Sequence, residues 1–250
     1  MEVHHPHSSH NGKKNFKQYF LEFLMLFLAV TLGFFAENMR EENVEHHREI
    51  EYIKSMIQDL NKDTANINNT VKRFENISLC FDTILQIFDK STISFSQTWS
   101  NNFVKIIKGG YPDYYYTDRT LQQLKNSGSM RLIKNQIVSN AIVDYDNANK
   151  DFMTEDGYLS HIQQQATECA FKVWSFKRLH QKLNSYQWFN KNIPEDNYWI
   201  IKDKATLEYF YNILSQFRES ENFQKNNLVK LQKQAIELIS LLNNEYHLEK

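Results

Sequence analysis

The chain has 250 residues, is nearly neutral and is poor in turn-forming residues. Its 29 Lys and Arg balance 30 Asp and Glu, which argues against the clustered basic face of a nucleic-acid-binding domain. Six glycines and three prolines are too few for the turns of a sandwich, a barrel or a doubly wound sheet. Two cysteines cannot build a Cys-only zinc site or a disulfide framework. We therefore expect an all-α protein without a nucleic-acid partner.

Residues 1–15 form a polar tail that contains four histidines, His4, His5, His7 and His10. We interpret it as a disordered cytoplasmic tail, although such a tract could bind a transition metal loosely. No other segment has the ligand spacing of a metal site, and we predict no cofactor.

Residues 16–37 have the length and composition of a transmembrane helix. The run from Phe23 to Ala36 is uncharged, and residues 16–36 would span about 31 Å as a helix, close to the thickness of a bilayer core. Glu22, one turn inside, can reach the headgroups or take a proton. The alternatives are a buried helix of a soluble protein and a signal peptide, for which Thr31 and Gly33 would be mediocre cleavage-site residues. The uniformly apolar surface favours an uncleaved anchor.

The charges that flank this segment predict its orientation. Lys13, Lys14 and Lys17 precede it, whereas acidic residues outnumber Arg40 and Arg48 after it. Because short basic flanks stay in the cytoplasm, we expect a cytoplasmic N-terminus in the bacterial inner membrane. Residues 38–250 would then form an extracytoplasmic, periplasmic domain.

One face of the predicted membrane helix carries Glu22, Ala29 and Gly33. Ala29 and Gly33 form a small-xxx-small pair, which lets two helices approach closely. This spacing predicts a homodimer seam, and with it a homo-oligomer. The alternative is chance, since small residues are common in membrane helices.

Apolar residues at alternating spacings of three and four run from Ile50 to Phe88. This pattern predicts that the membrane helix continues into a long helix of an antiparallel helical bundle. The last helix has a similarly narrow apolar stripe, so we expect it to be a neighbour of the first. The remaining predictions, in chain order, are helices over 94–108, from 118 and from 129, a helical segment over 151–185 with a potential break at Gly157, a connector over 188–202, a helix capped by Asp203, and a last helix over 221–246.

No segment combines a nucleophile, a base and an orienting acid, so we predict no catalytic residue and no enzyme. Cys80 and Cys169 lie in apolar helical patterns and are interpreted as buried structural residues, although a periplasmic location would permit a disulfide between them. The best candidate for a partner surface is an aromatic loop, because tyrosines give contact area at low entropic cost. The alternative is that this loop covers the end of the bundle. Its tyrosines are Tyr111, Tyr114, Tyr115 and Tyr116.

Two parts of the chain resemble a family of bacterial single-pass membrane proteins of unknown function. The first, residues 14–41 with 50–64, has an apolar anchor with an early Glu and an exit rich in Asn and Glu. The second, residues 120–146, has a characteristic turn, whose matching residues are Leu124, Lys125, Ser127, Gly128, Leu132, Ile133 and Asn135. The resemblance implies an N-terminally anchored helical architecture and brings no known activity.

Together these observations predict an anchored helical scaffold that acts through a lipid bilayer and an unknown protein partner. A ligand- or envelope-sensing module is the second hypothesis. It would need a partner, because the short N-terminal tail holds no output domain.

Overall fold

The computed structural model describes residues 15–88, 96–109, 114–183, 192–194, 196–200 and 203–248. Within these ranges all regular structure is helical, which confirms the all-α prediction. The chain divides into two compact units, residues 1–51 and 52–250, and helix α1 (Phe16–Leu85) contributes residues to both. The second unit begins at Tyr52, and residues 38–44 are exposed.

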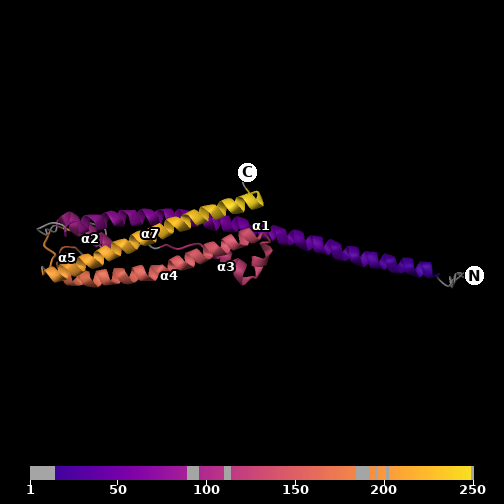
Figure 1. Ribbon diagram of the computed structural model, residues 1–250, viewed down its shortest axis with the longest axis horizontal. Coiled ribbons are helices and arrows are strands. Elements are labelled where there is room, and N and C mark those ends of the chain that lie inside the picture. Colours follow the sequence, from indigo (N-terminus) through magenta and orange to yellow (C-terminus); the bar gives the residue numbers. More distant parts are fainter. Residues whose placement is uncertain are drawn as a thin grey trace, which may run out of the picture. The chain divides into compact units, whose positions relative to one another are not determined.

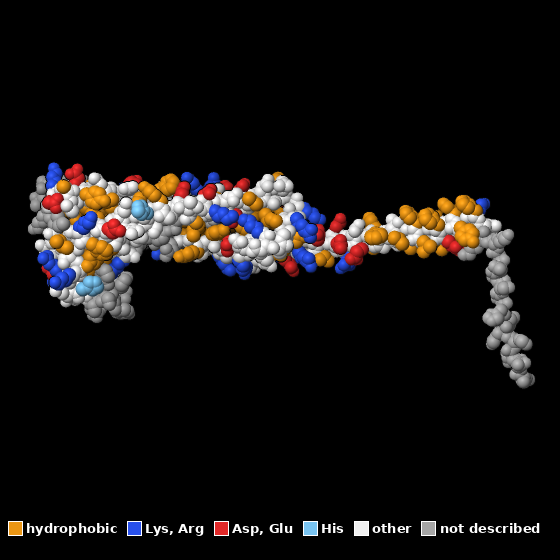
Figure 2. Space-filling model, turned by 90° about the horizontal axis from the view of Figure 1, so that it is seen from below, with side chains coloured by type: hydrophobic (Ala, Val, Ile, Leu, Met, Phe, Trp, Pro, Cys, Tyr) orange, Lys and Arg blue, Asp and Glu red, His pale blue; other side chains and the backbone are white. Residues whose placement is uncertain are grey.

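The first unit presents its apolar side chains to the outside. Every residue from 15 to 44 is exposed, and an 18-residue window with a mean hydropathy of 2.0 has no residue buried. Figure 2 shows apolar side chains around the N-terminal part of α1, followed by charged ones. Among the described residues, this is the one helix long and apolar enough to cross a membrane. Leu24 and Leu28 are 38% and 47% exposed, so this helix is not buried in a core of its own unit.

The second unit is a bundle of three long helices, which are the remainder of α1, α4 (Gln136–Val173) and α7 (Lys204–Tyr246) (Figure 1). Helix α7 runs antiparallel to α1, because Phe217 packs on Phe81 whereas the later Gln232 donates to the carbonyl of the earlier Thr64. The prediction that the first and last helices are neighbours is thereby confirmed. Helix α7 is antiparallel to α4 as well, so α1 and α4 run in the same direction (Figure 1).

Three short helical elements, α2, α3 and a 3₁₀ helix, lie between the end of α1 and the start of α4. Helix α2 (Gln97–Gly109) docks on α1 through Trp99, whose indole Nε1 donates to the carbonyl of Ile84 at 2.9 Å. Helix α3 (Arg119–Asn126) and the 3₁₀ helix η1 (Ser129–Leu132) then turn the chain into α4. Gly128 lies between them at a φ of 67°, a left-handed conformation that glycine adopts without steric cost.

The two later long helices are more continuous than the sequence predicts. Gly157 does not split α4, and a Cβ there would meet nothing within 4 Å, so this glycine occupies an open face of the helix. The expected gap between the helix capped by Asp203 and the helix over 221–246 is also absent. Asp203 does cap α7, and its carboxylate accepts the N–H of Thr206 at 2.9 Å. Buried residues continue through the expected gap and hold the two parts in one helix.

The helical segment predicted over 151–185 ends earlier, at Val173, and its Ser185 lies outside the described residues. The break has a local cause. The N–H of Ser175 donates to the carbonyl of Tyr198 at 2.6 Å, and the N–H of Ile200 donates to the carbonyl of Val173 at 3.0 Å. These bonds replace helical ones, and Ser175 then caps α5 (Phe176–Lys182).

Aromatic rings fill the end of the bundle where α2, α4 and α7 meet. Trp99, Trp174 and Trp199 lie with ring centroids 4.8–5.9 Å apart, and Trp174 stacks on Tyr198 at 4.9 Å. Such large buried rings contribute strongly to core stability. This end of the molecule is thus a packed core rather than a site.

Candidate functional site

Three aspartates are buried where α1, α3 and α4 meet, and they form the most polar part of the interior. Asp59 and Asp63 lie one turn apart on α1, and Asp146 lies on α4. None of the three is more than 1% exposed. Because a buried carboxylate is costly without partners, the hydrogen bonds of each one decide what the cluster does.

Asp59 caps helix α3 from a neighbouring helix. Its Oδ2 accepts the backbone N–H of Thr120 at 3.1 Å and the hydroxyl of the same residue at 2.5 Å. Its Oδ1 accepts from the guanidinium of Arg119 at 2.9 Å. Asp118 occupies the N-cap position but makes no side-chain cap bond. Helix α1 instead supplies the carboxylate that satisfies the first turn of α3.

Asp63 holds the segment that precedes α3. Its Oδ1 accepts the N–H of Thr117 at 2.6 Å, and its Oδ2 accepts the hydroxyl of Tyr145 at 2.9 Å. Burial raises the pKa of this carboxyl, although both hydrogen bonds act in the opposite direction. Asp63 therefore ties α1 to α4 through one side chain.

Asp146 is surrounded by three donors. Its Oδ1 accepts from the hydroxyl of Tyr116 at 2.9 Å, and its Oδ2 accepts from Lys125 and Lys150 at 2.5 and 2.6 Å. Burial alone would raise the pKa of Asp146, but these hydrogen bonds outweigh it and hold the pKa below its ordinary value. The carboxylate stays ionised and links α4 to α3.

The cluster is a clamp that joins three helices. Every aspartate oxygen described above accepts at least one hydrogen bond, and the hydroxyls and amines around the carboxylates are used as donors to them. The clamp also joins residues 50–64 to residues 120–146, the parts of the helical domain on which the family resemblance rests. Sequence reasoning missed it, although two aspartates one turn apart beside an apolar stripe were a visible signal.

Two tyrosines of the aromatic loop, Tyr114 and Tyr116, contact α4 near the aspartate cluster. Tyr114 is only 4% exposed, donates to Asn149 Oδ1 at 2.9 Å and packs edge-on against Phe152, so its prediction as part of a partner surface is wrong. Its burial against α4 follows from a polar partner for its hydroxyl and an apolar one for its ring. Tyr116 is half-buried through its bond to Asp146, and Tyr115 is 69% exposed. Tyr111 lies outside the described residues.

The two cysteines are free and buried, so the disulfide that a periplasmic location would permit is absent. Burial raises the pKa of both thiols. At Cys80 the positive charge of Lys105 acts to lower the pKa, but burial outweighs it. A thiol with a raised pKa is a poor nucleophile, which agrees with the interpretation of both cysteines as structural. Among the described residues no cluster of three His, Cys, Asp or Glu side chains could hold a metal ion, and the N-terminal histidines lie outside them.

A second polar feature lies on the core-facing stripe of α7. Glu221 and Gln224 are each 2% exposed, and within the described part of the chain neither oxygen of Glu221 nor Oε1 of Gln224 has a hydrogen-bond partner. Burial raises the pKa of Glu221 to about 9, so its carboxyl is protonated at neutral pH. Sequence reasoning missed both residues, although each interrupts the apolar spacing of the stripe.

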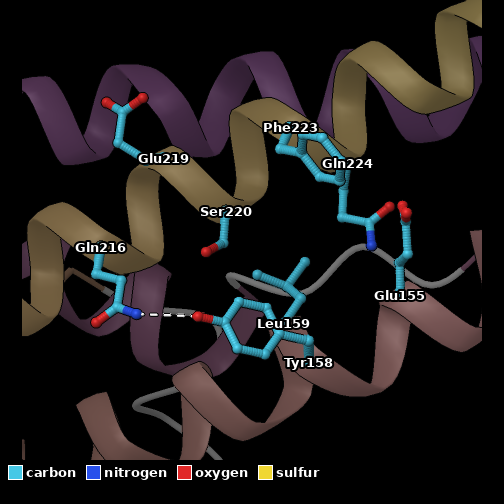
Figure 3. Close-up of a pocket in the computed structure, with 8 residues that line it drawn as sticks. All are labelled: Glu155, Tyr158, Leu159, Gln216, Glu219, Ser220, Phe223 and Gln224. Atoms are coloured by element: carbon cyan, nitrogen blue, oxygen red, sulfur yellow. Dashed lines mark hydrogen bonds between the residues drawn. The ribbon is translucent and has the colours of Figure 1, made fainter.

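Beside Gln224, a cleft of about 380 Å³ opens between α4 and α7 (Figure 3). Leu159 and the rings of Tyr158 and Phe223 supply its apolar surface, and Glu155 and Ser220 supply polar groups. The hydroxyl of Tyr158 accepts from Gln216 Nε2 at 3.1 Å across the two helices. A smaller hollow of about 200 Å³ also borders Glu155. The volume of the larger cleft, about 380 Å³, is within the range of small-molecule sites.

Comparisons with protein-family models, curated proteins and solved structures found no match to this chain. The resemblance of residues 14–41, 50–64 and 120–146 to a family of single-pass membrane proteins therefore stays a prediction.

Proposed function

We propose that this chain is a membrane-anchored helical scaffold, held in a bilayer by residues 16–37 and acting through its helical domain. The observation that carries the proposal is the exposure of the apolar part of α1, where no side chain of the most apolar 18-residue window is buried. An exposed run of Leu and Phe of this length costs free energy in water and is stabilised in hydrocarbon. An uncleaved anchor is favoured over a signal peptide because Thr31 and Gly33 make a mediocre cleavage site.

The proposed orientation puts the N-terminus in the cytoplasm and the helical domain in the periplasm of a bacterium. It rests on Lys13, Lys14 and Lys17 at the N-terminal end of the anchor and on the excess of acidic residues after it. In this arrangement the chain needs no chemistry of its own. Its contribution would be to hold a rigid bundle, clamped by Asp59, Asp63 and Asp146, at the membrane surface.

The proposed scaffold is a homodimer joined through Glu22, Ala29 and Gly33. A Cβ added at Gly33 meets nothing within 4 Å in one copy of the chain, so a larger side chain is tolerated by the monomer. In a dimer, the same side chain would separate two helices that approach at this position. A substitution at Gly33 therefore tests whether a second copy of the chain packs against this face.

We expect Gly33→Ile to reduce crosslinked dimer in membranes at least severalfold, because the branched side chain removes the close helix contact. The measurement is crosslinking of the full chain in native membranes, followed by separation of monomer from dimer. Leu24→Ile, on the opposite face of the helix, is the matched control and should leave the dimer unchanged. Equal crosslinking of all three chains would contradict the proposed seam.

A sensing module is the second proposal, and one observation favours it. The cleft between α4 and α7 borders Gln224, a buried side chain with an unpartnered oxygen, which is unusual in a purely structural bundle. A sensor of this kind would act through a protein partner.

A further inference from the structure

The cleft between α4 and α7 has hydrogen-bond acceptors but few donors. Gln224 Oε1 is buried and unpartnered, and Glu155 uses Oε2 to accept from Asn227 at 2.8 Å while Oε1 has no partner among the described residues. Figure 3 shows the Gln224 amide beside the Glu155 carboxylate, with the Ser220 hydroxyl directed between the helices. A buried acceptor without a donor is destabilising, so a ligand that donates there would remove that cost.

The charge of the cleft selects the kind of donor. Glu155 and Glu219 are the charged residues among the eight that line it, and none of the eight is Lys or Arg. Glu219 is paired with Arg218, which leaves Glu155 as the carboxylate that a ligand would neutralise. A cation is therefore favoured over a neutral donor, and an anion is disfavoured.

The walls of the cleft select the body of the ligand. Tyr158 and Phe223 are 59% and 54% exposed and offer ring surface, and Leu159 forms the buried floor. Aromatic rings attract an organic cation through their faces and also cover an apolar body. An inorganic cation would leave this apolar surface in contact with water.

We propose that this cleft binds a protonated organic amine, whose ammonium group donates to Glu155 Oε1 and Gln224 Oε1 and whose apolar body packs on Leu159, Tyr158 and Phe223. The site lies wholly in the helical domain. Its occupation is independent of the membrane anchor, so failure of this proposal and failure of the scaffold proposal are distinguishable.

The test is calorimetric titration of the full chain in detergent micelles with benzylamine at pH 7, with heats of titration into empty micelles subtracted. Benzylamine should bind saturably, benzyl alcohol roughly tenfold more weakly, and benzoate not at all. Glu155→Gln and Gln224→Leu should each weaken benzylamine binding roughly tenfold. Gln224→Leu also removes an unpartnered buried oxygen, so the melting temperature of this variant should not fall. A loss of benzylamine binding by this variant therefore cannot be assigned to unfolding.

Glu168→Gln is the matched control, because Glu168 is exposed on the same helix and accepts from an amide, that of Gln164, at 3.1 Å. It should bind benzylamine like the parent chain. The proposal is overturned if no saturable binding occurs, if benzyl alcohol binds as tightly as benzylamine, or if Glu155→Gln and Glu168→Gln behave alike.

Discussion

Asp59→Ala is expected to lower the free energy of unfolding of the helical domain by about 3–5 kcal/mol, the range for breaking a buried charged network. The substitution leaves the N–H of Thr120 without its acceptor and uncaps α3. It also removes the carboxylate from the Thr120 hydroxyl and the Arg119 guanidinium, which keep the hydroxyl of Ser55 as a partner. For a domain of this size the melting temperature should fall by roughly 10 °C. Circular dichroism of the full chain during thermal or urea unfolding measures the change.

Asp144→Ala is the matched control for this prediction. Asp144 is exposed on α4, two residues before Asp146, and no hydrogen bond or ion pair is formed by its side chain within the described part of the chain. Its loss should change the free energy of unfolding by less than about 0.5 kcal/mol. If Asp59→Ala and Asp144→Ala unfolded at the same temperature, the aspartate clamp would not hold the bundle together.

The second large effect concerns Glu221 and grows with pH. The pKa of its carboxyl is about 9 in the folded chain against an ordinary value of 4.5, so the folded state binds the proton that the unfolded state releases. Stability is then fully present below pH 4.5 and falls by about 1.4 kcal/mol per pH unit up to about pH 9. Glu221→Gln removes this dependence. Between pH 5 and pH 8 its advantage over the parent chain should grow by roughly 4 kcal/mol.

Urea unfolding of both chains at several pH values measures this difference. Titrating groups that do not interact with Glu221 cancel in the comparison. Cys80 on α1 does interact with Glu221, but burial raises the pKa of its thiol, which therefore stays neutral from pH 5 to pH 8, and Lys105 on α2 interacts with Cys80. The control is Glu219→Gln on the exposed face of α7, whose side chain is 69% exposed and paired with Arg218. A stability difference between Glu221→Gln and the parent chain that stayed constant from pH 5 to pH 8 would show that this carboxyl is not desolvated.

The helical class and most helix starts follow from local patterns in the sequence. The alternating apolar spacing from Ile50 onward predicts the buried face of α1, where Ile53, Leu60 and Ile67 are almost fully buried. Asp203 caps α7 as predicted, because an N-cap acts within a few residues. Features of this kind depend on neighbours in the chain and are accessible without a structure.

The polar interior was not predictable in the same way. The cap of α3 comes from Asp59, 61 residues before Thr120, and the break after Val173 depends on pairing with residues 198–200. The burial of Tyr114 depends on Asn149, which lies on α4, 35 residues later in the chain. Each of these depends on which helices become neighbours, and periodicity does not specify that.

The central claim is that α1 enters a bilayer and leaves the helical domain outside. Its most direct test is labelling with a membrane-impermeant maleimide, in intact bacterial spheroplasts, of full chains that carry His10→Cys, Leu28→Cys or Asn140→Cys. The native thiols are buried, so the parent chain provides the background. We predict that the thiol at position 140 reacts in intact spheroplasts, that at position 10 reacts only after lysis, and that at position 28 reacts only in detergent. Reaction at position 28 in intact spheroplasts at the rate found at position 140 would contradict the proposed insertion of α1 in the bilayer.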